Sequence, residues 1–126
     1  VSTGAWWDVV DELAQHGVGA VLLRHRSEAS PVVLGWASAD DLWVRRTAIL
    51  CQNRHRRETD LGLLGSVLDA NLEGSPYGTE FFIRKAIGWA LREQARHDLA
   101  WVRDYVDARG DRLSPLSRRE ALKHQA

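Results

Sequence analysis

The stretch FFIRKAIGWALREQAR, residues 81–96, decides the fold class. At about 100° per residue on an α-helix, five apolar side chains fall on one arc: Ile83, Ala86, Ile87, Ala90 and Leu91. The basic side chains and one aromatic gather on the other side: Lys85, Trp89, Arg92 and Arg96. Because the cations surround a large aromatic on the side turned from the apolar arc, this helix predicts a surface for an anionic partner with a flat or apolar part. Nucleic acid fits that description.

Composition limits the ways in which such a partner could be held. The chain has 126 residues, 44% of them hydrophobic, which is enough for one domain with a core. The formal net charge is zero, so only local basic patches can attract nucleic acid. The segment 42–57 is one such patch, with five arginines and no carboxylate. A single cysteine, Cys51, and histidines without ligand spacing predict neither a disulfide nor a metal site.

Helical periodicity runs through the chain, and β-alternation is nearly absent. Helix starts are indicated by capping residues: Ser38 with Asp41, Thr79, Asp98, and Ser117 with Glu120. We predict helices over 6–16, 18–25, 29–36, 40–53, 60–70, 80–96, 99–108 and 117–125. The more polar-faced helices recur with a period of roughly 40 residues, typical of HEAT-type repeats. The prediction is an all-α, HEAT-like helical-repeat solenoid, one domain over residues 1–126, with a plain irregular α-bundle as the alternative.

The first helix combines an aromatic and an acidic side chain. Four apolar residues share one arc that we expect to face the core: Trp6, Val9, Val10 and Leu13. Trp7 and Asp11 are four residues apart, so they sit together off that arc. An indole face attracts a cation and a carboxylate completes the counter-charge, so this pair could bind a cationic ligand. Alternatively, Trp7 packs on a neighbouring helix and Asp11 is solvated.

Arg46 occupies an unusual position in the predicted helix 40–53. It shares a sector with Leu42, Leu50 and Asn53, whereas Asp41, Arg45 and Gln52 form the predicted solvent-facing arc. A guanidinium in an apolar sector needs a partner, because desolvating it alone costs several kcal/mol. The partner is either a bound backbone phosphate or an internal carboxylate, and the sequence leaves both open.

These residues would line one surface of a solenoid, because equivalent helices of successive repeats share a face. That surface would present Trp7, Asp11, Arg46 and Trp89, with Lys85 and Arg92 beside the last. Two aromatics, a carboxylate and several phosphate-binding cations suit DNA. The sequence shows no Ser/His/Asp triad and no phosphate-cradling glycine loop.

Four segments carry a resemblance to a known family: AWWDVVDELA (5–14), ASADDLWVRRTAILCQ (37–52), FFIRKAIGWALREQAR (81–96) and LSPLSRREALKH (113–124). In sequence, order and spacing they resemble the AlkD-like DNA alkylation-repair glycosylases. The resemblance implies HEAT-like repeats with a concave basic surface for double-stranded DNA that contains alkylated bases. It also implies excision of cationic N3- and N7-alkylated purines by hydrolysis of the N-glycosidic bond, without metal or cofactor.

The resemblance assigns roles to individual residues of this chain. The family's catalytic carboxylate falls on Asp11, and its two catalytic tryptophans fall on Trp7 and Trp89. The family's backbone-binding arginine falls on Arg46. Lys85 and Arg92, beside Trp89, and Arg118 and Arg119, at the start of the last helix, are further candidates for phosphate contacts. We therefore expect a monomeric, cytoplasmic, nucleoid-associated enzyme with no membrane segment.

The chain departs from the family's pattern at its N-terminal end. Family members carry further helical repeats before the WWD segment, whereas this sequence begins almost on it. We therefore expect the C-terminal part of a longer protein. Two other functions stay open: a non-catalytic HEAT-like module that recognises distorted or branched DNA, and a protein-binding solenoid scaffold.

Overall fold

The computed structural model describes residues 9–123, which form two layers of helices and contain no strand. In chain order the elements are η1 (Leu13–Val18), a π-helical segment, α2 (Gly19–Arg24), α3 (Arg26–Trp36), α4 (Leu42–Leu50), η2 (Arg56–Glu58), α5 (Leu61–Asp69), α6 (Phe81–Ala95), α7 (Leu99–Arg109), η3 (Gly110–Arg112) and α8 (Pro115–Ala121). The all-α helical-repeat prediction is confirmed, while assignment to the HEAT type and the boundaries 1–126 stay predictions.

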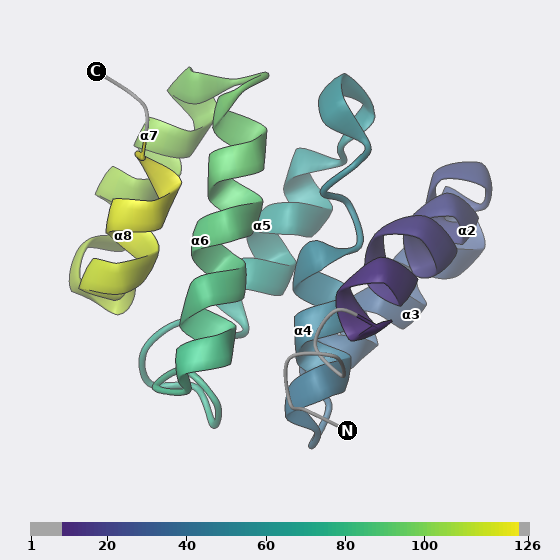
Figure 1. Cartoon of the computed structure of the whole chain (residues 1–126), viewed down its shortest axis with the longest axis horizontal. Helices are drawn as coiled ribbons and strands as arrows, with labels where there is room; N and C mark the ends of the chain where they lie inside the picture. The colour runs from purple at the N-terminus through teal and green to yellow at the C-terminus, as the bar shows by residue number, and fades with distance from the viewer. Residues whose placement is uncertain (1–8, 124–126) are drawn as a thin grey trace.

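Each layer is built from alternate helices (Figure 1). In one layer η1 packs on α4, α4 on α6, and α6 on α8. In the other layer α3 packs on α5, and α7 covers α6. A continuous apolar core lies between the layers, and the predicted buried arc of α6 belongs to it: Ile83, Ala86, Ile87, Ala90 and Leu91 are at most 2% exposed. Periodicity placed this face correctly because burying an apolar stripe is what stabilises a helix in a fold.

Helix starts differ from several of the predicted caps. Asp41, not Ser38, caps α4 by accepting bonds from the amides of Trp43 and Val44 at 2.8 and 3.1 Å. Ser114, not Ser117, caps α8, which explains why that helix begins earlier, at Pro115. Glu80 rather than Thr79 precedes α6, and its side chain makes no capping bond. The predicted cap at Asp98 is confirmed by a 3.0 Å bond from the amide of Trp101.

The first helix continues through the predicted break near residue 17. Residues 9–24 are helical throughout. Within this stretch, Leu13–Val18 (η1) has the wider hydrogen-bond pattern of a π-helix, and the helix continues past residue 17 into α2. Gly19 allows this helix to cross the end of α4, since a Cβ there would lie 2.4 Å from the carbonyl oxygen of Cys51. The expectation that 6–16 and 18–25 are separate helices is therefore wrong.

The expected core arc of the first helix is only partly buried. Val10 is 7% exposed, but Val9 and Leu13 are 50% and 61% exposed. Leu13 lines, with Val21 and Val32, an apolar outer face at one end of the layers, hollowed by about 740 Å³. In solenoids such a face is the kind of surface on which a neighbouring repeat stacks. Trp6, assigned to the same arc, lies outside the described residues.

None of the helices within residues 9–123 is long and apolar enough to cross a lipid bilayer.

Candidate nucleic-acid interface

Asp11 and Arg46 form a bidentate ion pair between the first helix and α4. Nε of Arg46 donates to Oδ1 of Asp11 at 2.9 Å, and Nη2 donates to Oδ2 at 3.0 Å. The side chains of Asp11 and Arg46 are 16% and 7% exposed. Nη1 of Arg46 also donates to the carbonyl oxygen of Phe82, the second residue of α6, at 2.6 Å. One guanidinium therefore connects three neighbouring helices of one layer.

This pair answers the question that the sequence left open about Arg46. Its partner is an internal carboxylate, the commoner outcome for a guanidinium in an apolar sector. The planar fork fixes both carboxylate oxygens of Asp11, and each oxygen has a further lone pair. Arg46 thus orients Asp11, and its contact to a DNA phosphate stays a prediction.

The predicted solvent-facing arc of α4 is wrong for two of its three residues. Arg45 is only 4% exposed and donates to the carbonyl oxygen of Ala39 and, at 3.2 Å, to Oδ1 of Asn71. Gln52 is 5% exposed and exchanges two bonds with the backbone of Asp60. Both side chains are buried because they satisfy backbone or amide groups of neighbouring loops, which compensates their desolvation.

Trp89 is half-buried on α6 and forms one wall of an open hollow of about 690 Å³. The first helix contributes Gln15, one turn beyond Asp11, to the same hollow. The remaining lining comes from the loop after α4 and from the end of α6: Asn53, Arg54, Arg56, Glu93, Arg96 and His97. The structure thus places Trp89 and the helix of Asp11 around one basic depression.

Lys85 and Arg92, predicted to bind phosphate beside Trp89, are instead turned toward α8. Nζ of Lys85 donates to Oε1 of Glu120 at 2.7 Å, and Nη1 of Arg92 donates to Oε2 at 3.0 Å. The hydrogen bond from Lys85 is the main cause that lowers the pKa of the Glu120 carboxyl below its usual value. Both cations are therefore partly neutralised within the protein, and their DNA contacts stay a prediction.

Gly88 makes this arrangement possible. A Cβ at Gly88 would lie 2.5 Å from the Cβ of Glu120 and 3.2 Å from the carbonyl oxygen of Ser117. Because no side chain separates the two helices at this point, α8 comes close enough for Glu120 to reach both cations. Helical periodicity gives no signal for this contact, since it depends on the crossing of two helices that brings together Gly88 and Glu120, 32 residues apart in the chain.

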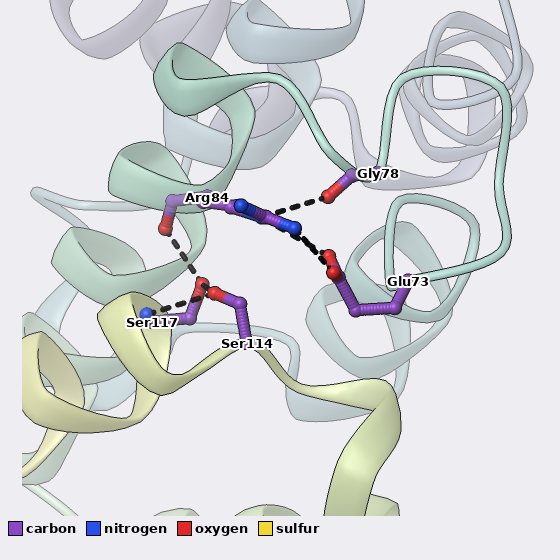
Figure 2. A network of polar contacts seen from close by, with 5 residues as sticks. All are labelled: Glu73, Gly78, Arg84, Ser114 and Ser117. Carbon is purple, nitrogen blue, oxygen red and sulfur yellow. Dashed lines mark hydrogen bonds and ion pairs between the residues drawn. The ribbon is translucent and has the colours of Figure 1, made fainter.

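A polar network holds the start of α6 and of α8 against the loop before α6 (Figure 2). The guanidinium of Arg84 pairs with Glu73 and donates to the carbonyl oxygen of Gly78 at 3.3 Å. The hydroxyl of Ser117 donates to the carbonyl oxygen of Arg84 at 2.8 Å and accepts a bond from the Ser114 hydroxyl at 2.9 Å. Of these residues only Ser117 was named from the sequence, as a cap of the last helix, and the contacts hold the start of α6 against α8 and the preceding loop.

Arg118 and Arg119 differ in their surroundings. Arg118 is half-buried and donates to the carbonyl oxygen of Gly110, at the end of α7. Arg119 is exposed. Arg118 therefore has a structural partner, and phosphate binding by either residue stays a prediction. Trp7, the predicted neighbour of Asp11, lies outside the described residues.

A metal centre has no ligand set in the described part of the chain. Across residues 9–123, no three His, Cys, Asp or Glu side chains come together in a group that could hold a metal ion. Burial raises the pKa of the Cys51 thiol to about 12, so this side chain behaves as a small apolar core residue.

Comparison with known proteins agrees with the four sequence segments. The family model described as DNA alkylation repair enzyme matches residues 1–125. A solved structure of a predicted DNA alkylation repair enzyme from Enterococcus faecalis superposes with a TM-score of 0.82 and 32% sequence identity. The match covers 96% of this chain and 54% of that one, so the chain spans about half the length of this relative. No curated protein matches the chain. The chain belongs to the family of DNA alkylation repair enzymes.

Proposed function

We propose that the protein is a monofunctional DNA glycosylase that excises cationic N3- and N7-alkylated purines from double-stranded DNA. The observation that carries the proposal is the Asp11 carboxylate, oriented by Arg46 on the same helix face that leads to the Trp89 hollow. Family membership supports a repair function. The class of lesion and the glycosylase chemistry come from the resemblance of the four segments.

The chemistry suits a site with one carboxylate and no metal. An alkylated purine with a positive charge is already a good leaving group, so its departure needs no general acid. As the C1′–N bond breaks, its electron pair neutralises the base and the sugar becomes oxocarbenium-like, as in glycoside hydrolysis. A carboxylate held beside C1′ stabilises that developing charge and orients the attacking water.

Arg46 would give Asp11 its geometry, and the two aromatics would hold the nucleotide. Because the guanidinium of Arg46 already holds both oxygens of Asp11, the carboxylate would not have to reorient when the bond breaks. This is the advantage of a preorganised charge. Trp89 offers an indole at the edge of the hollow, and Trp7 would provide the second aromatic contact. In this proposal the lesion is held largely within the duplex rather than flipped into a deep pocket.

The alternative is a non-catalytic DNA-binding module that recognises distorted or branched DNA. One observation favours it: both oxygens of Asp11 already accept bonds from Arg46, which is also what a purely structural ion pair would show. Family members without catalysis would be expected to lose the carboxylate or the tryptophans, and this chain has all of them.

Base release distinguishes the two functions. The complete gene product is incubated with a duplex that contains 7-methylguanine, and free base is separated from DNA by chromatography. The proposal predicts 7-methylguanine in the free fraction and an abasic site in the strand. Salt-dependent DNA binding without any free base would favour the non-catalytic module.

A further inference from the structure

We propose that the hollow beside Trp89 is a second DNA subsite, which takes a backbone phosphate of a nucleotide neighbouring the lesion on Arg54 and Arg56. This inference rests on the proposed DNA-directed function and adds a binding site lined by α6, the first helix and the loop after α4, whereas Lys85 and Arg92 are turned toward Glu120 of α8. No role was assigned to these two arginines from the sequence beyond their place in the basic segment 42–57.

The hollow carries positive charge that the described residues do not fully compensate. Three arginines line the hollow, and one carboxylate, Glu93, faces them. Glu93 pairs with Arg96 at 3.7 Å, so its charge is directed to the α6 side of the hollow. Arg54 and Arg56 are both exposed and have no ion-pair partner among residues 9–123. Uncompensated guanidinium groups in a depression are bidentate ligands for phosphate.

One side chain of the hollow has a hydrogen-bond donor without a partner. Nδ2 of Asn53 is buried and has no hydrogen-bond partner in the described structure, although its side chain lines the hollow. A buried amide N–H without a partner costs stability, so such a group commonly marks a place where a ligand or water completes the bond. A rotation of the Asn53 side chain would bring this donor to a phosphate oxygen held by Arg54 and Arg56.

The loop that carries Arg54 and Arg56 is anchored to neighbouring segments by hydrogen bonds. His55, which stands between Arg54 and Arg56 in the sequence, is buried. Its Nε2 donates to the carbonyl oxygen of Gly19 at 2.7 Å. Burial is the main cause that lowers the pKa of His55 below its usual value. The two bonds between Gln52 and the backbone of Asp60 close the same loop.

Arg56 adds a conformational observation. Its φ is 55°, in the left-handed region that a residue with a side chain adopts at a cost of about 1 kcal/mol or more. Arg56 is the one non-glycine residue with a positive φ among residues 9–123. An arginine kept in this conformation at the edge of a basic hollow, where glycine would be less strained, is consistent with a need for its side chain.

Trp89 connects this subsite to the proposed catalytic site. Its indole borders the hollow, and the hollow is large enough for a nucleotide unit rather than a phosphate ion alone. A nucleotide that places its phosphate on Arg54 and Arg56 can lay its sugar or base against the indole. The hollow would then fix the register of the strand while Asp11 acts on the adjacent sugar.

The test is a charge-matched pair of double variants of the complete gene product. R54Q/R56Q removes the two cations of the hollow, and R24Q/R103Q removes two exposed arginines that lie away from it. Binding to a fluorescent duplex is measured by anisotropy over a range of salt concentrations. We expect R54Q/R56Q to raise the Kd by about tenfold and to reduce the salt slope by about 1, whereas R24Q/R103Q stays close to wild type.

Single-turnover base release separates this inference from the proposed function. For R54Q/R56Q, the half-saturating DNA concentration should rise by about tenfold, in step with the Kd, whereas R24Q/R103Q should keep both the wild-type rate and the wild-type half-saturating concentration. An unchanged salt slope for R54Q/R56Q, or an equal loss for both double variants, would overturn the subsite. Intact DNA affinity without base release by wild type would reject the glycosylase while leaving the subsite supported by its salt slope.

Discussion

Two bidentate Asp–Arg pairs, one in each layer, have nearly the same geometry and different surroundings. Asp11 and Arg46 connect the first helix to α4 at 2.9 and 3.0 Å, and Asp69 and Arg109 connect α5 to α7 at 2.9 Å in both bonds. The first pair is more buried: Asp11 is 16% and Asp69 38% exposed in its side chain. Only the first pair lies in the layer that contains Trp89.

The second pair is completed by groups within the protein. The hydroxyl of Tyr105 donates to Oδ1 of Asp69 at 2.9 Å, and Arg109 lies 4.1 Å above the Tyr105 ring. Burial works to raise the pKa of Asp69, but the hydrogen bonds from Arg109 and Tyr105 outweigh it and lower the pKa. Trp101 also stacks on Tyr105, with ring centroids 5.4 Å apart. The Asp69–Arg109 pair therefore serves to connect α5 to α7.

The comparison shows that ion-pair geometry alone does not identify a reactive carboxylate. What distinguishes Asp11 is its position: it lies one helical turn before Gln15, which lines the basic hollow, and its partner Arg46 reaches the start of α6. A carboxylate can serve DNA chemistry only on a face where cations are left for phosphate. Variants of the two pairs should therefore separate stability from activity.

The largest expected change in stability follows from removing Arg46. In Arg46→Leu the Asp11 carboxylate and the Phe82 carbonyl lose their donor in a mostly buried setting, so unfolding should become easier by about 3 kcal/mol. The matched variant Arg109→Leu breaks a more exposed pair and should cost only about 1 kcal/mol. Urea denaturation followed by circular dichroism measures both. Equal losses would mean that the two pairs do not differ as described.

A smaller loss of stability is expected when a side chain is introduced between α6 and α8. In Gly88→Ala the new methyl group collides with the Cβ of Glu120, and we expect destabilisation by about 2 kcal/mol. Gly62→Ala is the control, because the nearest atom to its added Cβ, Oδ1 of Asp60, is 3.5 Å away. That exposed helical site should be neutral or slightly stabilised. A tolerated Gly88→Ala would show that α8 is not packed as closely as the structure has it.

The smallest effect concerns the pH dependence of stability. Because the folded pKa of Glu120 lies below its usual 4.5, its ion pairs contribute above pH 4.5, and this contribution is lost as the pH falls through the lowered pKa. Glu120→Gln removes that titration, so its stability should fall less steeply below pH 4.5 than that of wild type, by under about 1 kcal/mol. Urea midpoints between pH 7 and pH 3 measure it, and identical slopes would contradict the assignment.

The sequence predicts most helices and the residues of the proposed site, but not how those residues are paired. The buried arc of α6 follows from periodicity alone, and Arg46 is recognisable as a charge that needs a partner. Which partner it takes depends on the crossing of two helices. The two errors on the predicted helix 40–53 have the same origin: Arg45 bonds to Asn71 after α5 and Gln52 bonds to Asp60 before α5, and helical periodicity carries no information on such bonds.

Sequence reasoning also missed the loop between α4 and α5 as a separate feature. Its arginines were visible as part of the basic segment 42–57, but the hollow they line requires the first helix and α6 to meet around them. The available signal was the run RHRR at 54–57, in which a histidine interrupts the cations. His55 is the buried anchor, and its neighbours Arg54 and Arg56 face the hollow.

The central claim is that Asp11 acts on the sugar of a cationic alkylpurine nucleotide, and one measurement tests it most directly. Single-turnover release of 7-methylguanine is compared for the complete wild-type protein, Asp11→Asn and the control Glu12→Gln, whose exposed carboxylate is adjacent in sequence. We predict that Asp11→Asn lowers the rate at saturating DNA by about 100-fold or more while the fold and DNA affinity are retained, and that Glu12→Gln is unchanged. Wild-type release by a folded Asp11→Asn would contradict the proposed role of this carboxylate.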